Sequence, residues 1–325
     1  MSVKLDDVAK LAGVSKTTVS RVLNNRGYLS AETKKKVQDA MQALNYHPNA
    51  IARQLFRKET KLVGLIFPTV DNPFFGELVA ELEKRLFNAG FKVFIGNSMN
   101  DPKKEKVYLQ ELIANQVDGL IVGAHNYNIA EYKTVNLPIV AIDRIINKDI
   151  PIIASDNYQG GKLATELLLA KGARHIVVTD GPLNLETPAH RRRLAYQECM
   201  TAHHLTPHTF IINFSSSIDE KRSAIKKMFH LYPEMDGVFA TNDIDAALVW
   251  QTATELGIHV PDELKIVGYD HANSTKLLLP QLTTIEQPVT RMADLAVETL
   301  ISRINGHQTP QEQLVPVTVW NGQSV

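Results

Sequence analysis

The segment GVSKTTVSRVLN, residues 13–24, concentrates side chains that form hydrogen bonds. It holds one lysine, one arginine, two serines and two adjacent threonines around four aliphatic residues. An arginine can donate two hydrogen bonds to O6 and N7 of guanine, and a hydroxyl can bond either a base or a phosphate. This set of side chains is suited to contacts with phosphates and base edges.

A predicted helix over residues 16–24 positions these groups. Ser15 can accept a hydrogen bond from the first turn as the N-cap. The spacing of Val19, Val22 and Leu23 gives the helix one apolar side. The polar residues that then face outward are Lys16, Thr17, Ser20 and Arg21.

Two further short helices are expected around this one. An apolar stripe of Leu5, Val8, Leu11 and Ala12 predicts a first helix, which Gly13 ends. Ser30 can cap a third helix over 31–45, with Val37, Met41 and Leu44 inside. Two helices joined by a short turn with glycine are typical of a helix-turn-helix motif, whose second helix enters the major groove. A three-helix bundle that only packs is the alternative.

The distribution of charge supports contact with a polyanion. The net charge is zero, but residues 1–60 carry 11 Lys and Arg against 5 Asp and Glu, and residues 61–325 carry 24 against 30. A basic head on an acidic body favours a polyanionic partner, and a solvated basic surface is the alternative.

With one cysteine, Cys199, no disulfide framework is expected. The first residues lack the apolar run of a signal peptide, and no stretch approaches the roughly 18 to 20 apolar residues of a membrane helix. We therefore expect a cytoplasmic protein.

From Lys61 onward, short apolar runs alternate with helical segments. The runs occur at 62–67, 91–96, 119–124 and 138–143, and again at 175–181, 209–214, 237–243 and 264–270. Helices are expected near 75–89, 160–171, 189–203, 219–231 and 244–256. This alternation predicts an α/β body of two doubly wound parallel-sheet subdomains, with strand ends facing a shared cleft. Crossovers between the subdomains are expected near 155–158, 283–288 and 312–317.

Polar residues end three of these runs. Asp143, Asn242 and Asp270 each follow a predicted strand. Sugar hydroxyls donate and accept hydrogen bonds, and carboxylates and amides pair with them. A polar residue after a parallel strand can instead cap the next helix, so both interpretations stay open.

The head resembles the LacI/GalR family of bacterial repressors. DVAKLAGVSKTTVSRVLN, residues 7–24, looks like that family's N-terminal signature, and YHPNAIARQL, residues 46–55, resembles its hinge. The resemblance implies a homodimer that reads pseudo-palindromic operator DNA. Lys4 is a departure, because several relatives have a capping threonine there. The residues placed on DNA by the resemblance are Lys16, Thr17 and Arg21 at bases, Thr18 and Ser20 at phosphates, Asn24 and Ala52 as further contacts, and Leu55 wedged into the minor groove.

The body is similar to periplasmic sugar-binding proteins and to the effector domain of the same family. By this resemblance Asp143, Arg193, Asn242 and Asp270 contact a small sugar or sugar-phosphate effector. The remaining candidates are Phe74, Phe75 and Phe214 as rings against the ligand, and Gln287 on a crossover. Phe75 could be core instead, and Arg191 and Arg192 are expected to be solvated or to contact another subunit. Arg144, where some relatives have an aromatic residue, could favour an anionic effector or point to solvent.

The resemblance also implies a domain plan. It comprises a helix-turn-helix domain (1–46), a hinge helix and linker (47–60), and an effector-binding and dimerisation domain (61–325), the last with an N-subdomain at about 61–156 and 287–313 and a C-subdomain at about 157–286 and 314–325. No leucine heptads follow the body, so we expect a dimer without the tetramer-forming tail of some relatives.

We therefore predict a repressor of a sugar-utilisation operon, located with bacterial DNA in the cytoplasm. Residues 96–126 and the GYLS segment look most like sucrose-operon repressors of Gram-positive bacteria. A ribose-type repressor, the global carbon-catabolite regulator of the family with its phosphocarrier partner, and a soluble sugar-binding receptor are the alternatives. No metal, cofactor or membrane partner is expected, because the His203–His204 pair lacks ligand spacing and no GxGxxG or Walker A sequence occurs. No nucleophile–base constellation indicates an enzyme.

Overall fold

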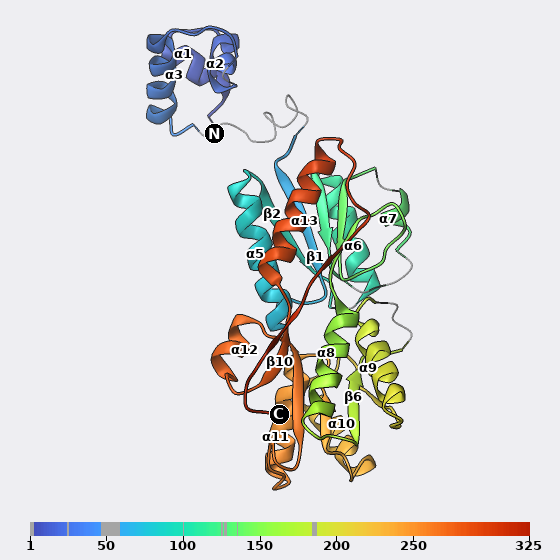
Figure 1. The fold of residues 1–325 in the computed structure, drawn as a ribbon. Coiled ribbons are helices and arrows are strands. Elements are labelled where there is room, and N and C mark those ends of the chain that lie inside the picture. The colour runs from blue at the N-terminus through green and yellow to red at the C-terminus, as the bar shows by residue number, and fades with distance from the viewer. Residues whose placement is uncertain are drawn as a thin grey trace. The chain divides into compact units, whose positions relative to one another are not determined.

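A computed structural model describes residues 3–24, 26–46, 59–99, 101–124, 126, 129–134, 136–183 and 187–325. The chain forms two compact units, Met1–Thr60 and Lys61–Val325 (Figure 1). The hinge candidates Ala52 and Leu55 lie outside the described residues.

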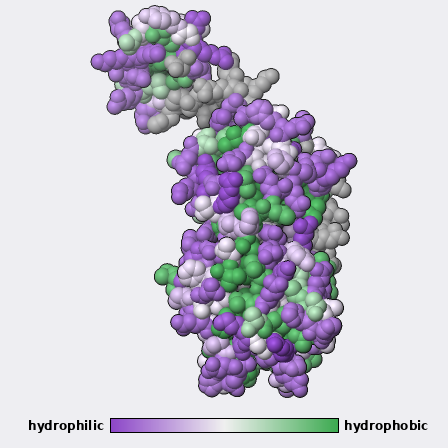
Figure 2. Space-filling view, viewed as in Figure 1, coloured by the Kyte–Doolittle hydropathy of each residue, from purple (hydrophilic) through white to green (hydrophobic). Residues whose placement is uncertain are grey.

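The first unit contains three short helices packed on one small core. They are α1 (Leu5–Ala12), α2 (Lys16–Leu23) and α3 (Ala31–Ala43). Gly13 ends α1 with φ +65°, a conformation that glycine adopts at low cost. The core is formed by Val8, Ala9, Ala12, Val19, Val37 and Ala40. In the predicted apolar stripe of α1, Leu11 is 55% exposed, whereas Ala9, which is outside the stripe, is buried. Hydrophilic residues cover most of the visible surface of this unit (Figure 2).

The second unit begins with a sheet in the order β11-β5-β4-β3-β1-β2, in which every pair is parallel. We call this sheet and its helices the first lobe. The strands are β1 (Leu62–Phe67), β2 (Lys92–Asn97), β3 (Gly119–Val122), β4 (Ile139–Ile142), β5 (Ile152–Ser155) and β11 (Glu312–Val315). One face packs on α5 (Pro73–Asn88) and α13 (Val289–Ile304), and the other packs on α6 (Pro102–Ala114) and α7 (Glu131–Thr134).

A second sheet, in the order β12-β10-β9-β8-β6-β7, forms the second lobe. Its strands are β6 (Ile176–Asp180), β7 (His208–Ile211), β8 (Gly237–Phe239), β9 (Lys265–Asp270), β10 (Thr283–Glu286) and the antiparallel edge strand β12 (Thr318–Trp320). The helices α8 (Asn157–Ala170) and α9 (His190–Ala202) cover one face, and α10 (Ile218–Leu231) and α11 (Asp243–Glu255) cover the other. A short helix, α12 (Asn273–Leu278), follows β9.

The chain crosses between the lobes three times, after β5, after β10 and after β11 (Figure 1). The expected architecture of two doubly wound, mainly parallel sheets is confirmed. The strand β5 was not predicted, because only a crossover near 155–158, at its C-terminal end, was expected. None of the helices in the described part of the chain is long and apolar enough to cross a membrane.

Candidate functional site

The helix α2 presents cationic and hydroxyl side chains from a capped scaffold. Ser15 Oγ accepts a hydrogen bond from Thr18 N at 3.0 Å, which confirms the predicted cap. Val19 is fully buried beneath the helix. The outward residues Lys16, Thr17 and Arg21 are exposed. Because the apolar side anchors α2 in the small core, the opposite side is open to a partner.

The other predicted DNA contacts on α2 already have partners within the helix. Thr18 Oγ1 lies 2.8 Å from Ser15 Oγ, and Asn24 Nδ2 donates to Ser20 O at 2.8 Å. The side chains of Ser20 and Asn24 are half-buried. These residues therefore stabilise the two ends of α2, whereas Lys16, Thr17 and Arg21 remain on its exposed side.

Lys4 occupies the N-cap position of α1. A lysine side chain has no acceptor, so it cannot cap a helix N-terminus. Asp7 accepts instead from the backbone N–H of Lys4 at 2.8 Å. Asp6 pairs with Lys16 of α2 at 3.0 Å, with both side chains 61% exposed. Such an exposed pair contributes little stability and leaves Lys16 able to exchange its partner.

In the second unit, Asp143 lies where the two lobes meet. It follows β4 with φ +46°, and it is buried. Asn157, the first residue of α8 on the second lobe, donates from Nδ2 to Asp143 Oδ1 at 3.2 Å. Burial raises the pKa of the Asp143 carboxyl to about 6, and the positive charge of Arg192 partly offsets this rise. Asp143 is therefore a carboxylate held between the lobes.

Arg192 is the centre of this junction, and the prediction that it is solvated or contacts another subunit is wrong. Its Nε donates to Asn157 Oδ1 at 2.7 Å, and its Nη1 donates to the Thr241 carbonyl at 2.7 Å. The guanidinium lies 3.5 Å from the centre of the Tyr269 ring. A Cβ at Gly161 would lie 2.3 Å from the Arg192 carbonyl oxygen, so glycine is what allows α8 and α9 to approach so closely. Arg191 is exposed, as expected, and its Nη1 lies 3.6 Å from Glu312.

Asp270 and Gln287 form a second buried pair at this junction. Gln287 Nε2 donates to Asp270 Oδ1 at 2.7 Å, and Asp270 has φ +120°. Burial raises the pKa of Asp270 well above its usual range, with Arg192 acting in the opposite direction and Asp243 adding to the rise. Gln287 Oε1 is buried and accepts no hydrogen bond from the part of the chain that the structure describes. An acceptor of this kind is suited to a hydroxyl donor.

Asn242 has the helix-capping role that the sequence analysis left open. Its Oδ1 accepts from Asp245 N at 2.9 Å at the start of α11, and its Nδ2 donates to Asp245 Oδ2 at 2.7 Å. Asp245 is buried and pairs with Lys221 of α10 at 2.8 Å. A contact between Asn242 and an effector stays a prediction.

Arg193 of α9 pairs with Asp180 at the end of β6, in a group that was not predicted. Its Nε donates to Asp180 Oδ2 at 2.6 Å, and His190 Nδ1 lies 2.9 Å from the same oxygen. The Phe214 ring is half-exposed and packs against Gly181. A Cβ at position 181 would be 2.1 Å from the ring, so this packing requires glycine. Asp180 is the last polar residue of the predicted run 175–181, so the rule that identified Asp143 could have identified it as well.

The adjacent aromatic residues at the start of α5 differ in their surroundings. Phe74 is buried in the core between α5, α13 and the first sheet, whereas Phe75 is half-buried at the edge of that core. The rings of Phe67 and Phe75 are 6.0 Å apart. Of the two, Phe75 has the more accessible ring face.

Arg144 is buried, so the prediction that it points to solvent is wrong. Its Nη1 pairs with Glu105 Oε1 at 2.6 Å, and its Nη2 donates to the Asn126 carbonyl. The side chains of Arg144 and Glu105 are 7% and 0% exposed. Arg144 therefore belongs to the interior of the first lobe and is not available to an anionic effector.

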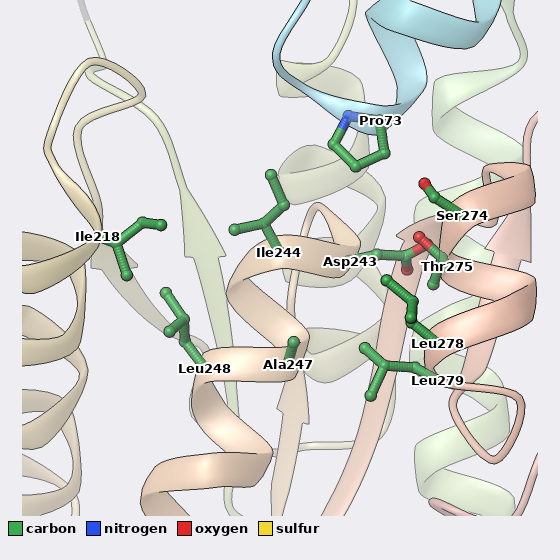
Figure 3. A pocket seen from close by; sticks show the side chains of 10 residues that line it. All are labelled: Pro73, Ile218, Asp243, Ile244, Ala247, Leu248, Ser274, Thr275, Leu278 and Leu279. Carbon is green, nitrogen blue, oxygen red and sulfur yellow. The ribbon is translucent and has the colours of Figure 1, made fainter.

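A cavity of about 200 Å³ lies between α11, α12 and the start of α5, where the two lobes meet (Figure 3). Its walls are mostly aliphatic, and they include Asp243, whose carboxylate already accepts from Thr284 Oγ1 at 2.6 Å and His271 N at 2.7 Å. None of the eight predicted effector contacts lines it. Its lining is Pro73, Ile218, Asp243, Ile244, Ala247, Leu248, Ser274, Thr275, Leu278 and Leu279.

A second contact between the lobes lies next to this cavity. The residue before α12, Ala272, has no side chain that could cap the helix. Glu77 of α5, on the first lobe, accepts from Asn273 N at 2.6 Å and from Asn273 Nδ2 at 2.9 Å. The carboxylate that caps α12 therefore comes from the opposite lobe.

Known proteins share both parts of this architecture. A family profile described as "Bacterial regulatory proteins, lacI family" matches residues 4–49, and one described as "Periplasmic binding protein-like domain" matches residues 165–325. A sucrose operon repressor from Pediococcus pentosaceus is 47% identical over 94% of this chain and 93% of its own length. This chain belongs to the LacI family.

Two solved structures of the LacI family extend the comparison. The lac repressor dimer bound to operator and the anti-inducer ONPF has a TM-score of 0.88 at 28% identity, covering 100% of this chain and 99% of that chain. A periplasmic binding protein/LacI transcriptional regulator from Alkaliphilus metalliredigens, complexed with D-xylulofuranose, has a TM-score of 0.73 at 32% identity, covering 81% and 98%. Membership of this family of DNA-binding regulators also confirms the expectation that the chain is not an enzyme.

Proposed function

We propose that this LacI-family protein represses a sugar-utilisation operon, and that a small sugar bound between its two lobes sets its affinity for operator DNA. The observation that carries the proposal is the exposed side of α2, where Lys16, Thr17 and Arg21 project from a capped and anchored helix. The name of the Pediococcus pentosaceus relative supports a sucrose operon as the target. Operator DNA places the protein in the bacterial cytoplasm.

The charges at the junction favour an uncharged sugar over a sugar phosphate. Asp143 supplies a carboxylate there and Asp180 supplies another at the end of β6, whereas Arg192 and Arg193 are already bonded to protein groups. Carboxylates accept hydrogen bonds from sugar hydroxyls but repel a phosphate dianion. The D-xylulofuranose complex of the relative from Alkaliphilus metalliredigens is consistent with this choice.

We propose that the effector contacts are Asp143, Arg193, Asp270 and Gln287, with the rings of Phe75 and Phe214 against the less polar sugar faces. A ligand that bonds residues of both lobes changes their relative orientation, since Asp143 and Asn157 already link the lobes. In a homodimer this reorientation reaches both hinge segments, including Ala52 and Leu55. Effector and operator affinities are then reciprocally coupled, typically by about 1–3 kcal/mol.

Removing residues 1–60 tests the proposal against a soluble sugar-binding receptor. The unit Lys61–Val325 has its own cores, so we expect it to fold and to keep its sugar affinity. Operator binding, measured by gel shift, should be lost completely. The ligand is found beforehand by a thermal-shift screen of the full chain with sucrose, glucose, fructose, ribose and sugar phosphates, because a ligand of the folded state raises its stability. A full chain that shows no preference for a palindromic site over scrambled DNA would contradict the repressor proposal.

A further inference from the structure

A buried ion pair begins at the residue that follows Asp143 in the chain. Arg144, the next residue in the chain, pairs with Glu105 of α6 at 2.6 Å. Glu105 is completely buried and accepts two more hydrogen bonds, from Tyr132 Oη at 2.7 Å and from Asn126 Nδ2 at 2.7 Å. The Arg144 guanidinium also lies 5.0 Å from the centre of the Tyr132 ring. The pair is thus satisfied on all sides, as a buried charge requires.

This pair adjoins a backbone conformation that needs support. Asp143 has φ +46°, and a non-glycine residue in this region persists only where its surroundings fix it. Before Asp143 the chain is fixed by β4, and Asp143 N donates to the Ile153 carbonyl at 3.1 Å. Directly after Asp143, the Arg144 side chain is held by Glu105 and by the Asn126 carbonyl. If that anchor were lost, residue 143 could relax toward a negative φ, and its carboxylate would turn away from Asn157.

The second lobe repeats this arrangement with different residues. Asn242, which also follows a strand, is bonded to Asp245, and Asp245 pairs with the buried Lys221 at 2.8 Å. In each lobe a buried ion pair includes a residue close in the sequence to a polar residue that follows a strand, and its other partner comes from a neighbouring helix.

We propose that Glu105 is a positioning residue for the effector site, which holds Arg144 in place and so directs the Asp143 carboxylate toward the bound sugar. The inference rests on the proposed function for its consequence, because it assumes that Asp143 contacts the effector. The position of Asp143 itself can be measured without any ligand.

The first test removes both buried charges in the full chain. Glu105→Leu/Arg144→Met replaces the pair with apolar side chains and removes both buried charges, although the Tyr132 hydroxyl and the Asn126 amide and carbonyl lose these partners. The pKa of Asp143 is measured by carbon-13 NMR of the aspartate carboxyl groups, with Asp143→Asn used to assign the signal. The groups that face Asp143 are Arg192, Asn157, Asp270 and Tyr269, and all remain in this variant.

The expected result is a pKa of Asp143 that falls by at least one unit from about 6, since a carboxylate turned toward water loses the effect of burial. Affinity for the sugar that stabilises the parent in the thermal-shift screen should fall at least tenfold in calorimetry. Operator affinity without sugar should change less than twofold. Lys106→Met on the same helix removes only the exposed pair with Glu131, so both quantities should stay at the parent values.

A folded double variant that keeps both the parent pKa and the parent sugar affinity overturns the inference. If the double variant does not fold, Arg144→Lys decides the question. A lysine keeps a charge for Glu105 but has no second donor arm for the Asn126 carbonyl, so we expect the same changes in a smaller amount. Parent values in Arg144→Lys would then overturn the inference. A parent that binds no sugar but shows the lowered pKa in the variant would contradict the proposed effector and leave the positioning role supported.

Discussion

The helix α2 and the junction of the two lobes present their polar groups in opposite ways. On α2, the side chains of Lys16, Thr17 and Arg21 are exposed, and their conformations become fixed when a partner binds. At the junction, Asp143 and Asp270 are buried, and each already accepts a hydrogen bond from a neighbouring side chain in the protein without ligand. The first surface loses side-chain entropy on binding, whereas the second incurs the cost of burying charge on folding. Substitutions in the first should therefore alter binding alone, and substitutions in the second should alter ionisation, stability and binding together.

The largest effect is expected from Asp270→Ala at the junction. Loss of the carboxyl group that we propose to bond the sugar should weaken sugar binding about 100-fold, or ~3 kcal/mol, and abolish the effector response. Operator binding without sugar should persist. Calorimetry and gel shift measure the two quantities, and the exposed Asp262→Ala on the same lobe is the control. A variant that binds sugar as well as the parent would show that Asp270 does not contact it.

The next effect concerns the pH dependence of stability at Asp143. Because burial raises its pKa from 3.8 to about 6, the folded protein holds this proton at a higher pH than the unfolded chain does. The cost of burying the charged form is therefore absent below the unfolded pKa and fully present above about pH 6. Asp143→Asn, which cannot ionise, should match the parent near pH 4 and exceed its free energy of unfolding by up to ~3 kcal/mol at pH 7. Urea unfolding across this range measures the difference, and a difference that does not vary with pH would contradict the burial of a charge.

A smaller effect is expected on the DNA-facing side. Arg21→Ala should weaken operator binding by about 1–3 kcal/mol and relax the base preference at one position, because Arg21 is exposed on α2. Its thermal stability should not change, which is the contrast with the junction. Lys10→Ala, an exposed cation on α1, is the control. Equal weakening on random DNA would make Arg21 a phosphate contact instead of a base contact.

The smallest effect tests how far the scaffold of α2 matters. Ser15→Ala removes the acceptor for Thr18 N and should destabilise the first unit by ~1 kcal/mol. Hydrogen exchange of the α2 amides in the full chain should accelerate accordingly. Ser30→Ala removes the equivalent cap of α3 and should cost about as much stability with less effect on operator affinity. Equal losses of operator affinity in both variants would show that DNA binding depends on the stability of the unit as a whole.

Features that depend on neighbours in sequence were predictable. The caps at Ser15 and Ser30 and the left-handed Gly13 follow from residue type and position, and the structure confirms them. The parallel sheets follow from the spacing of apolar runs, and strand ends led to Asp143 and Asp270. Because parallel strands end at one edge of each sheet, this rule needs no knowledge of distant contacts.

Features that depend on distant partners were not predictable. The burial of Arg144 and Arg192 depends on distant partners, among them Glu105 and Asn157, which are 39 and 35 residues away in the sequence. One signal was available for Arg192, because Ala195, Tyr196 and Met200 continue the buried face of α9 from its position. Leu11 could have faced inward on helical spacing, but α3 packs on the neighbouring face through Ala9.

The carboxylate of Glu77 gives the short helix α12 a dependence on the rest of the fold. An isolated helix of six residues is not stable in water, and the N-cap residue of α12, Ala272, has no side chain that could accept a hydrogen bond. Its first turn is therefore intact only in the geometry that brings α5 alongside. If the lobes swing apart, fraying of α12 should follow, and a spectroscopic label on the exposed Leu277 would report the motion directly.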